Sequence, residues 1–262
     1  MALMGKICLP CPKKSSHKGQ NGVVLIIGGS KTYHGAPVLA ARAAVRFCDL
    51  VYFASTKENN ALVRRMKLAT ANVICVPKSR FNFALAHATC VLVGNGMDVN
   101  AKTKAAVAAV LRSKKKCVID AAALRVLPVK LLRKDVILTP HAREFEASFG
   151  ISASEKNARA MSKKYGCTIL LKGEKDIVAS EGKVVKITGG NAGMTKGGTG
   201  DVLAGLCAAL FSACHSPMKA ACTASAINKR AGELLFKRYR YNFSSEDLAD
   251  ELASAARFLP CK

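Results

Sequence analysis

The stretch NAGMTKGGTGDVLAG, residues 191–205, places three glycines and one carboxylate directly before an apolar helical segment. Glycine weakens a helix, so Gly197, Gly198 and Gly200 call for a reason other than helix formation. Glycines let several backbone N–H groups point into one concavity, and the helix that follows adds the positive end of its dipole. The stretch therefore predicts a binding site for a phosphate or another oxyanion. It lacks the Lys-Ser/Thr pair of a Walker motif.

Asp201 follows these glycines and carries a charge that a bound phosphate would repel. An aspartate is ionised at neutral pH, because its reference pKa is ~3.9, and it can accept the proton of an alcohol held against it. The alcohol oxygen would then attack a phosphoryl group held by the glycine amides. The alternative interpretation is a simple helix cap. The glycines before Asp201 favour catalysis.

Short apolar runs rich in β-branched residues recur along the chain and predict strands. We expect these strands near 23–27, 50–54, 72–76, 90–93, 116–119, 135–138 and 167–171. Alanine-rich stretches with helical spacing, such as 36–48 and 100–113, lie between most of them. This alternation predicts an α/β fold with a parallel sheet covered on both faces, and ligands at the carboxyl ends of its strands.

The pattern changes after residue 170. The segment 176–188 predicts a hairpin that turns at Glu181 and Gly182. Three helices then follow, near 199–213, 217–238 and 245–258, and Ser244 or Ser245 suits the start of the last one. With no linker, repeat or low-complexity segment, residues 1–262 are predicted to form a single domain.

The chain is strongly basic, with 41 Lys and Arg against 17 Asp and Glu among 262 residues and a net charge of +24. Such an excess favours anionic partners, namely nucleotides, phosphorylated metabolites or RNA. RNA binding also needs a basic stripe and stacking aromatics, and the chain has no tryptophan. A basic RNA-associated protein stays an alternative, and we expect nucleic-acid contact to be non-specific.

The remaining composition predicts a cytoplasmic protein without membrane association. No apolar run approaches the ~20 residues of a membrane span, and the first twenty residues hold no apolar signal core. Most of the eleven cysteines lie inside apolar runs, where a thiol acts as a small hydrophobe. Cys8 and Cys11 have metal-like spacing, but a zinc site needs a second pair.

The segment GMTKGGTGDVLAG (193–205) resembles the signature of the ADP/ATP-dependent NAD(P)H-hydrate dehydratases, a branch of the ribokinase-like superfamily. Further blocks resemble this family in order and spacing. They are HKGQNGVVLIIGGSKTYHGAPVLAARAAVR (17–46), VGNGM (93–97, against VGPGL), VIDAAAL (118–124, against VLDADAL), ILTPHAREF (137–145) and LLKGEKDIVA (170–179). The resemblance covers nearly the whole chain. It implies a three-layer ribokinase-like fold with a mainly parallel central sheet.

The resemblance also implies an activity. The family repairs NADHX and NADPHX, the forms of NADH and NADPH in which water has added to the nicotinamide ring, and it acts on the S form. The ring hydroxyl is phosphorylated with ADP or ATP as donor, and phosphate then leaves as the double bond re-forms. Mg²⁺ assists the nucleotide. We expect ADP as donor, as is general among bacterial and archaeal relatives, and a homotetramer.

By this resemblance, site residues carry over position by position. Substrate contacts fall on His141 and Asp201, with Asp201 as the base. Ala36, whose small side chain allows close approach, and Gly96, in the GNG turn, are two further substrate candidates. Nucleotide contacts fall on Lys172, Gly173, Glu174, Lys175, Asp176, Gly197, Gly198, Thr199 and Gly200. Glu144 corresponds to an acid that helps to hold Mg²⁺, through water.

Each supporting position also has an ordinary structural interpretation. The segment 172–176 could be a basic turn into a hairpin, His141 a structural histidine, and Glu144 an exposed helix acid. Pro140 is expected to begin the next helix.

Substituting Gly198 with valine is expected to abolish nucleotide binding while the fold is retained.

Two positions depart from the family pattern. Ala122 replaces the second acid of VLDADAL, although Asp120 keeps the first, and Asn228 stands where the family often has histidine. The enzyme alternative is a small-alcohol kinase of the same fold that acts on a vitamin precursor. The TPHxxEF and GMTKGGTGD blocks favour the dehydratase.

Overall fold

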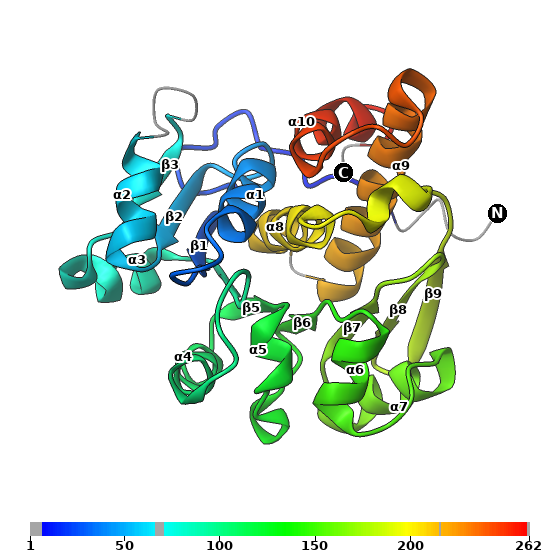
Figure 1. Cartoon of the computed structure of the whole chain (residues 1–262), viewed down its shortest axis with the longest axis horizontal. Coiled ribbons are helices and arrows are strands. Elements are labelled where there is room, and N and C mark those ends of the chain that lie inside the picture. The colour runs from blue at the N-terminus through cyan, green and yellow to red at the C-terminus, as the bar shows by residue number, and fades with distance from the viewer. Residues whose placement is uncertain (1–6, 66–70, 215, 261–262) are drawn as a thin grey trace.

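The computed structural model describes residues 7–65, 71–214 and 216–260. Their strands form one nine-stranded sheet in the order β3-β2-β1-β4-β5-β6-β7-β8-β9 (Figure 1). The strands are β1 (Val23–Ile27), β2 (Leu50–Ala54), β3 (Val73–Cys75), β4 (Cys90–Val93), β5 (Lys116–Ile119), β6 (Val136–Leu138), β7 (Thr168–Leu171), β8 (Asp176–Ser180) and β9 (Lys183–Ile187). β1 to β7 pair in parallel, and β8 and β9 are antiparallel.

Helices cover both faces of this sheet. They are α1 (Gly35–Ala44), α2 (Lys57–Arg65), α3 (Phe81–His87), α4 (Ala101–Arg112), α5 (Ala122–Arg125), α6 (Ala142–Phe149), α7 (Glu155–Tyr165), α8 (Thr199–Ala213), α9 (Pro217–Tyr239) and α10 (Ser245–Ala256). α1, α8, α9 and α10 lie above the sheet in Figure 1, and α4 to α7 lie below it. The predicted three-layer α/β architecture with a mainly parallel sheet is confirmed.

The buried strands contribute side chains to two hydrophobic cores, one on each face of the sheet. In β1, Val24 and Ile26 belong to the core shared with α1 and α8, whereas Leu25 belongs to the core shared with α3 and α4. All three side chains are fully buried. A strand covered on both faces needs apolar residues at every position, which explains the continuous apolar runs in the sequence.

The predicted strands agree with the observed ones to within a residue at each end. The predicted hairpin is also confirmed, as β8 and β9 are joined at Glu181 and Gly182, with φ of 50° and 77°. Two successive positive φ values are typical of the tight turns that join antiparallel strands. The helix expected over 36–48 ends at Ala44, and the last helix begins after Ser244, its N-cap.

Two features of the fold mark the carboxyl ends of β1 and β4 as the place for a ligand. First, β1 and β4 are neighbours, while the chain from β1 runs to β2 and β3 on the other side, so the strand order reverses between β1 and β4. Open α/β sheets bind ligands at such a switch point. Second, α8 packs closely on α1, because a Cβ on Gly205 would lie 2.1 Å from the backbone oxygen of Ala40. Glycine at position 205 therefore lets the middle of α8 lie directly against α1.

Candidate active site

The start of α8 forms the glycine turn that the sequence predicted. Gly198 is the N-cap residue and has a left-handed φ of 94°. The hydroxyl of Thr199 donates to the backbone oxygens of Met194 (2.6 Å) and Lys196 (2.9 Å), which fastens the turn to the helix. Gly197 and Gly200 do not need a positive φ. Gly197 borders open space, since a Cβ at this position would contact nothing within 4 Å.

Asp201, in the first turn of α8, is held by a residue that the sequence analysis did not select. The side-chain amide of Asn95 donates to Asp201 Oδ1 (2.7 Å) and to Asp120 Oδ2 (2.9 Å). Asn95 follows β4 at the switch point and is fully buried. A polar residue between two glycines at a strand end was the available signal.

Asp120 is the centre of a buried polar cluster. It follows β5, is 2% exposed and accepts hydrogen bonds from Thr139 Oγ1 (2.8 Å) and Lys172 Nζ (2.9 Å). The same Lys172 nitrogen lies 3.6 Å from Glu144 Oε2. Lys172, which follows β7, thus faces two carboxylates, Asp120 after β5 and Glu144 in the helix after β6. The family acid retained at Asp120 is part of the site.

Lys172 also lies beside the glycine turn. A Cβ on Gly200 would stand 3.3 Å from Lys172 Nζ. Burial opposes the charge of Lys172, but the carboxylates of Asp120 and Glu144 outweigh burial and raise its pKa. The sequence predicted that Lys172 contacts the nucleotide. The structure places its ammonium between the carboxylates and the helix start where an anion is expected.

The pKa of Asp201 is raised to about 6, mainly by burial and next by the neighbouring charge of Asp120. The hydrogen bond from Asn95 and the charge of Lys172 lower this pKa in part. A base works best when its pKa lies near the operating pH. Asp201 is therefore ionised at neutral pH and more basic than an exposed aspartate.

His141 and Glu144 form a capping box at the start of α6. His141 Nδ1 accepts from the backbone N–H of Glu144 (3.3 Å), and Glu144 Oε2 accepts from the backbone N–H of His141 (2.9 Å). The prediction that Pro140 begins this helix was wrong. α6 begins at Ala142, because His141 supplies the cap and Pro140 lies before it. His141 stays half exposed.

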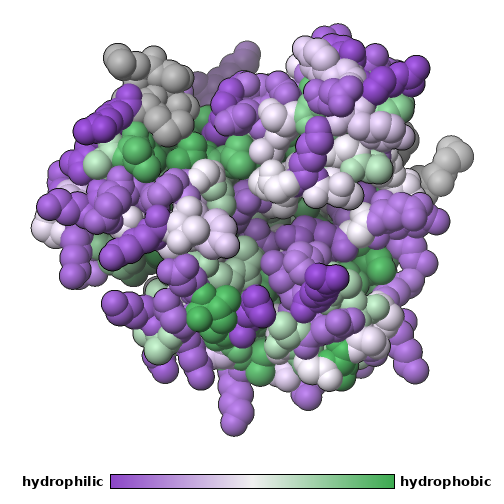
Figure 2. Space-filling view, viewed as in Figure 1, coloured by the Kyte–Doolittle hydropathy of each residue, from purple (hydrophilic) through white to green (hydrophobic). Residues whose placement is uncertain are grey.

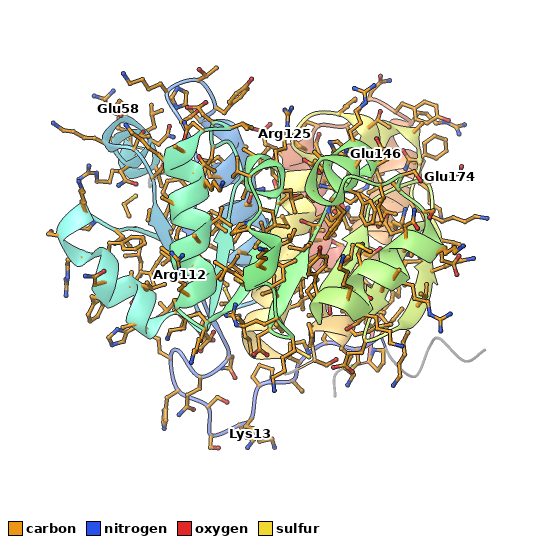
Figure 3. All side chains as sticks on the ribbon, turned by 90° about the horizontal axis from the view of Figure 1, so that it is seen from below. Lys13, Glu58, Arg112, Arg125, Glu146 and Glu174 are labelled. Atoms are coloured by element: carbon orange, nitrogen blue, oxygen red, sulfur yellow. The ribbon has the colours of Figure 1, made fainter. Side chains whose placement is uncertain are left out.

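A cavity of about 590 Å³ opens beside this cap, a size that suits a small-molecule site. Its lining includes Tyr33, Arg125, His141 and Glu144, and Arg125 lies in the upper half of Figure 3. Ala122 also lines it, so the departure at this position removes a carboxylate from the cavity wall.

Two predicted substrate positions lie next to each other at the same end of the sheet. A Cβ on Gly96 would lie 3.2 Å from the Cβ of Ala36, and Gly96 has a φ of 70°. Gly96 follows Asn95, which holds Asp201. The structure thus brings Ala36 and Gly96 together near the predicted base.

The turn after β7 holds the other predicted nucleotide contacts. Gly173, Glu174 and Lys175 are exposed, and Glu174 lies in the upper half of Figure 3, to the right of Arg125. Asp176 is buried instead. Its carboxylate accepts from the Gly173 N–H (3.0 Å) and the Ser225 hydroxyl (2.7 Å). Asp176 shapes the turn from within.

A residue of α9 holds this turn. Lys229 is 6% exposed and donates to the backbone oxygen of Glu174 (2.9 Å). Its neighbour Asn228, the second departure, is also buried, and its Oδ1 has no hydrogen-bond partner among the described residues. The structure gives no further account of the asparagine there.

A larger hollow of about 820 Å³ lies at the opposite end of the molecule. Its lining includes Lys13, Asp49 and Ala213, and Lys13 lies at the far edge of Figure 3 from Arg125 and Glu174. Ala213 ends α8, whereas Asp201 lies near its start. Size alone therefore does not mark the site, which the carboxylates and the glycine turn locate elsewhere.

Two features are absent from residues 7–65, 71–214 and 216–260, a membrane-spanning helix and a cluster of metal-binding side chains. No helix there combines the length and apolar character of a membrane span. No group of three or more His, Cys, Asp or Glu side chains there is arranged to hold a metal ion.

Comparisons with known proteins give the family of the chain. The family model described as NAD(P)H-hydrate dehydratase matches residues 24–254. The chain is 35% identical over 271 residues to the ADP-dependent (S)-NAD(P)H-hydrate dehydratase of Nitrosopumilus maritimus, covering 95% of this chain and 93% of that one. It is 38% identical over 252 residues to the bifunctional NAD(P)H-hydrate repair enzyme Nnr of Methanocaldococcus jannaschii, of which it spans about half (93% and 50%).

Solved structures show the same fold. The ADP/ATP-dependent NAD(P)H-hydrate dehydratase of Bacillus subtilis, co-crystallised with ATP and Mg²⁺, superposes with a TM-score of 0.83 at 23% identity, covering 95% of this chain and 94% of that one. The arrangement is ribokinase-like, as in solved members of that superfamily.

Proposed function

The chain belongs to the NAD(P)H-hydrate dehydratase family, and from this membership we propose that it returns (S)-NADHX and (S)-NADPHX to NADH and NADPH with an adenine nucleotide as co-substrate. The observation that carries the proposal is the position of Asp201. It is a largely buried carboxylate with a raised pKa, at the start of a helix whose glycine turn is open to an anion. ADP is the proposed donor, as in the relative from Nitrosopumilus maritimus.

We propose the following sequence of bond changes. Asp201 accepts the proton of the ring hydroxyl, and the hydroxyl oxygen forms a bond to the terminal phosphorus of ADP while the bond from that phosphorus to AMP breaks. The ring nitrogen lone pair then pushes out phosphate with the electrons of the C–O bond. Loss of a ring proton restores the double bond. Hydroxide is a poor leaving group and phosphate a good one, which explains a kinase-like site in a dehydratase.

The backbone amides at the start of α8 and the ammonium group of Lys172 beside them suit the transferred phosphoryl group. Gly197, Gly198, Thr199 and Gly200 present the positive end of the helix dipole, and Lys172 adds a full charge beside Gly200. Charge that develops on phosphate oxygens is stabilised best by groups already oriented before the reaction. The exposed turn of Gly173, Glu174 and Lys175, which Asp176 shapes, is proposed to contact the rest of the nucleotide.

The hydrate is proposed to occupy the cavity beside α6. His141 and Glu144 line this cavity, and Gly96, which packs against Ala36, lies at the same end of the sheet. Glu144 is proposed to hold Mg²⁺ through water, and the ion would neutralise phosphate charge. One carboxylate with nucleotide oxygens is a common Mg²⁺ arrangement, in contrast to a dedicated protein cage.

The basic surface suits these anionic substrates. Most of the face in Figure 2 is hydrophilic, in keeping with the net charge of +24. Such a surface raises encounter rates with a dinucleotide and with ADP. We further propose that the chain is one domain, since one sheet runs through its described residues. The homotetramer and the cytoplasmic location stay predictions.

Substituting Gly200 with alanine tests the anion site without harming the helix. The added Cβ would stand 3.3 Å from Lys172 Nζ, where phosphate oxygens are expected. We expect the Kd for ADP to rise by about tenfold, which corresponds to the loss of roughly one charge-assisted hydrogen bond. Stability should not fall, because alanine favours a helix over glycine by about 1 kcal/mol.

Isothermal titration calorimetry with ADP and ATP, paired with thermal unfolding, measures both effects. Gly35→Ala is the matched control, as Gly35 also opens a helix and its Cβ would contact nothing within 4 Å. Wild-type affinity in Gly200→Ala would place the phosphates elsewhere.

The pKa of Asp201 predicts the pH dependence of the reaction. The base must be ionised in the free enzyme, so kcat/KM should fall as the pH drops through about 6. An exposed aspartate would give a fall near pH 4 instead. Initial rates between about pH 3 and about pH 8, a range that brackets both values, distinguish the two cases. An acid limb near 4 contradicts a buried base.

A further inference from the structure

Asn95 occupies a tightly fixed position at the switch point. It lies between Gly94 and Gly96, whose φ values are 125° and 70°. A Cβ on Gly94 would lie 1.9 Å from the backbone oxygen of Asp120, so the chain approaches β5 too closely for any other residue. The carbonyl of Asn95 accepts from the N–H of Gly29 (2.8 Å), after β1. The backbone therefore fixes the direction in which the amide points.

The chemistry of its neighbours decides how the amide is turned. Nδ2 donates one bond to Asp120 and one to Asp201, so both of its hydrogens are used. The reverse orientation would set Oδ1 against two carboxylate oxygens without any hydrogen between them. The observed orientation leaves Oδ1 buried and without a partner among the described residues, which is unfavourable for stability.

Asp120 makes this link rigid. Thr139 and Lys172 hold Asp120 through its Oδ1, and Asn95 takes its Oδ2. Asn95 connects Asp120, whose position is fixed, to Oδ1 of Asp201. Asp201 Oδ2 makes no hydrogen bond to any residue that the structure describes. One carboxylate oxygen is thus fastened and the other is left for a substrate hydroxyl.

We propose that Asn95 is a positioning residue, which fastens Asp201 to Asp120 and aims its second oxygen at the hydroxyl of the hydrate. Only the kinetic part of this inference rests on the proposed function. The VGPGL turn that VGNGM resembles has proline at this position, and proline offers no side-chain donor. Asn95 also places a donor between two like charges that would otherwise repel each other.

Substituting Asn95 with alanine should lower kcat by about tenfold with little change in KM, because the base is present but poorly aimed. Loss of a hydrogen bond to the ionised form should also raise the pKa of Asp201. The acid limb of the pH–rate profile should then move to higher pH. The other charged groups that face Asp201 are Asp120, Lys172 and Glu144, and the substitution leaves them in place.

Asn60→Ala is the matched control. Asn60 is also buried, donates once through Nδ2 to the backbone oxygen of Val76 (3.2 Å) and has a buried, unpartnered Oδ1. A loss of stability alone should be alike in both variants, whereas kcat and the acid limb should change only in Asn95→Ala. Asn95→Ser replaces the alanine variant if that variant folds poorly. The serine hydroxyl is too short to bridge both carboxylates, so kcat should again fall and the acid limb should again move to higher pH.

A carboxyl NMR titration of Asp201 in the unliganded protein completes the test, because it needs no turnover. If wild type does not repair hydrated NADH, the proposed function fails, and a pKa that rises in Asn95→Ala still supports the contact. If wild type turns over and Asn95→Ala keeps its kcat and acid limb, the positioning role is overturned. An unchanged Asp201 titration in the variant overturns the contact itself.

Discussion

Substituting Asp201 with asparagine is expected to lower turnover of hydrated NADH by about 10²- to 10⁴-fold, the usual effect of removing a general base. Asparagine keeps the shape of the side chain and can still accept the hydrogen bond from Asn95 at Oδ1. Nucleotide affinity should change little, because the amides of the glycine turn are intact. Steady-state kinetics with calorimetry on the same preparation measures both, and near-wild-type turnover would remove Asp201 from the role of base.

The same variant should be more stable than wild type at neutral pH. The pKa of Asp201 is raised from 3.8 to about 6 in the folded protein, so the native state holds the proton more tightly than the unfolded chain. Its ionisation therefore destabilises the fold as the pH rises between these two values. The gain in Asp201→Asn should reach about 1–3 kcal/mol at pH 7 and vanish near pH 4. Urea unfolding at the two pH values checks the sign.

Substituting Gly198 with valine is expected to destabilise the protein by about 2–6 kcal/mol, from backbone strain and overpacking together. Gly198 has a φ of 94°, which a β-branched residue strongly resists. Its Cβ would also lie 2.4 Å from Leu39 Cδ1 and 2.7 Å from the Ser245 hydroxyl. The prediction from sequence, that this variant keeps its fold and loses only nucleotide binding, is therefore replaced.

Denaturant unfolding measures this loss, and Gly197→Val serves as its control. Gly197 precedes Gly198 in the same turn, but its Cβ would contact nothing within 4 Å and its φ is not positive. The two variants add the same side chain one residue apart, so only Gly198→Val should unfold at much lower urea. Equal midpoints for both variants would contradict the described geometry of the turn.

Strands and layers were predictable because burial on both faces requires apolar residues at every strand position. The hairpin was predictable for a similar reason, since Glu181 and Gly182 stand between two strand-like runs. The start of the sixth helix was not. His141 caps α6 through a reciprocal pair of bonds with Glu144, and the usual preference for proline in a first turn pointed to Pro140 instead.

The site was predictable where one local segment makes it and not where distant segments meet. Asp201 and its glycines lie within a few residues of each other. The contact between Asn95 and Asp201 spans 106 residues and depends on the parallel register of β4 against β1. Lys172 was predicted as a site residue, but only the order of β5, β6 and β7 shows that its side chain reaches Asp120.

The repair assay on the purified protein tests the central claim most directly. Hydrated NADH is supplied with ADP, with ATP or with no nucleotide, and the return of reduced-nicotinamide absorbance is followed. We predict that absorbance returns with an adenine nucleotide, faster with ADP than with ATP, that it does not return without one, and that AMP and phosphate form in equal amounts with ADP. A protein that phosphorylates a small alcohol but leaves hydrated NADH unchanged with either nucleotide would contradict the account.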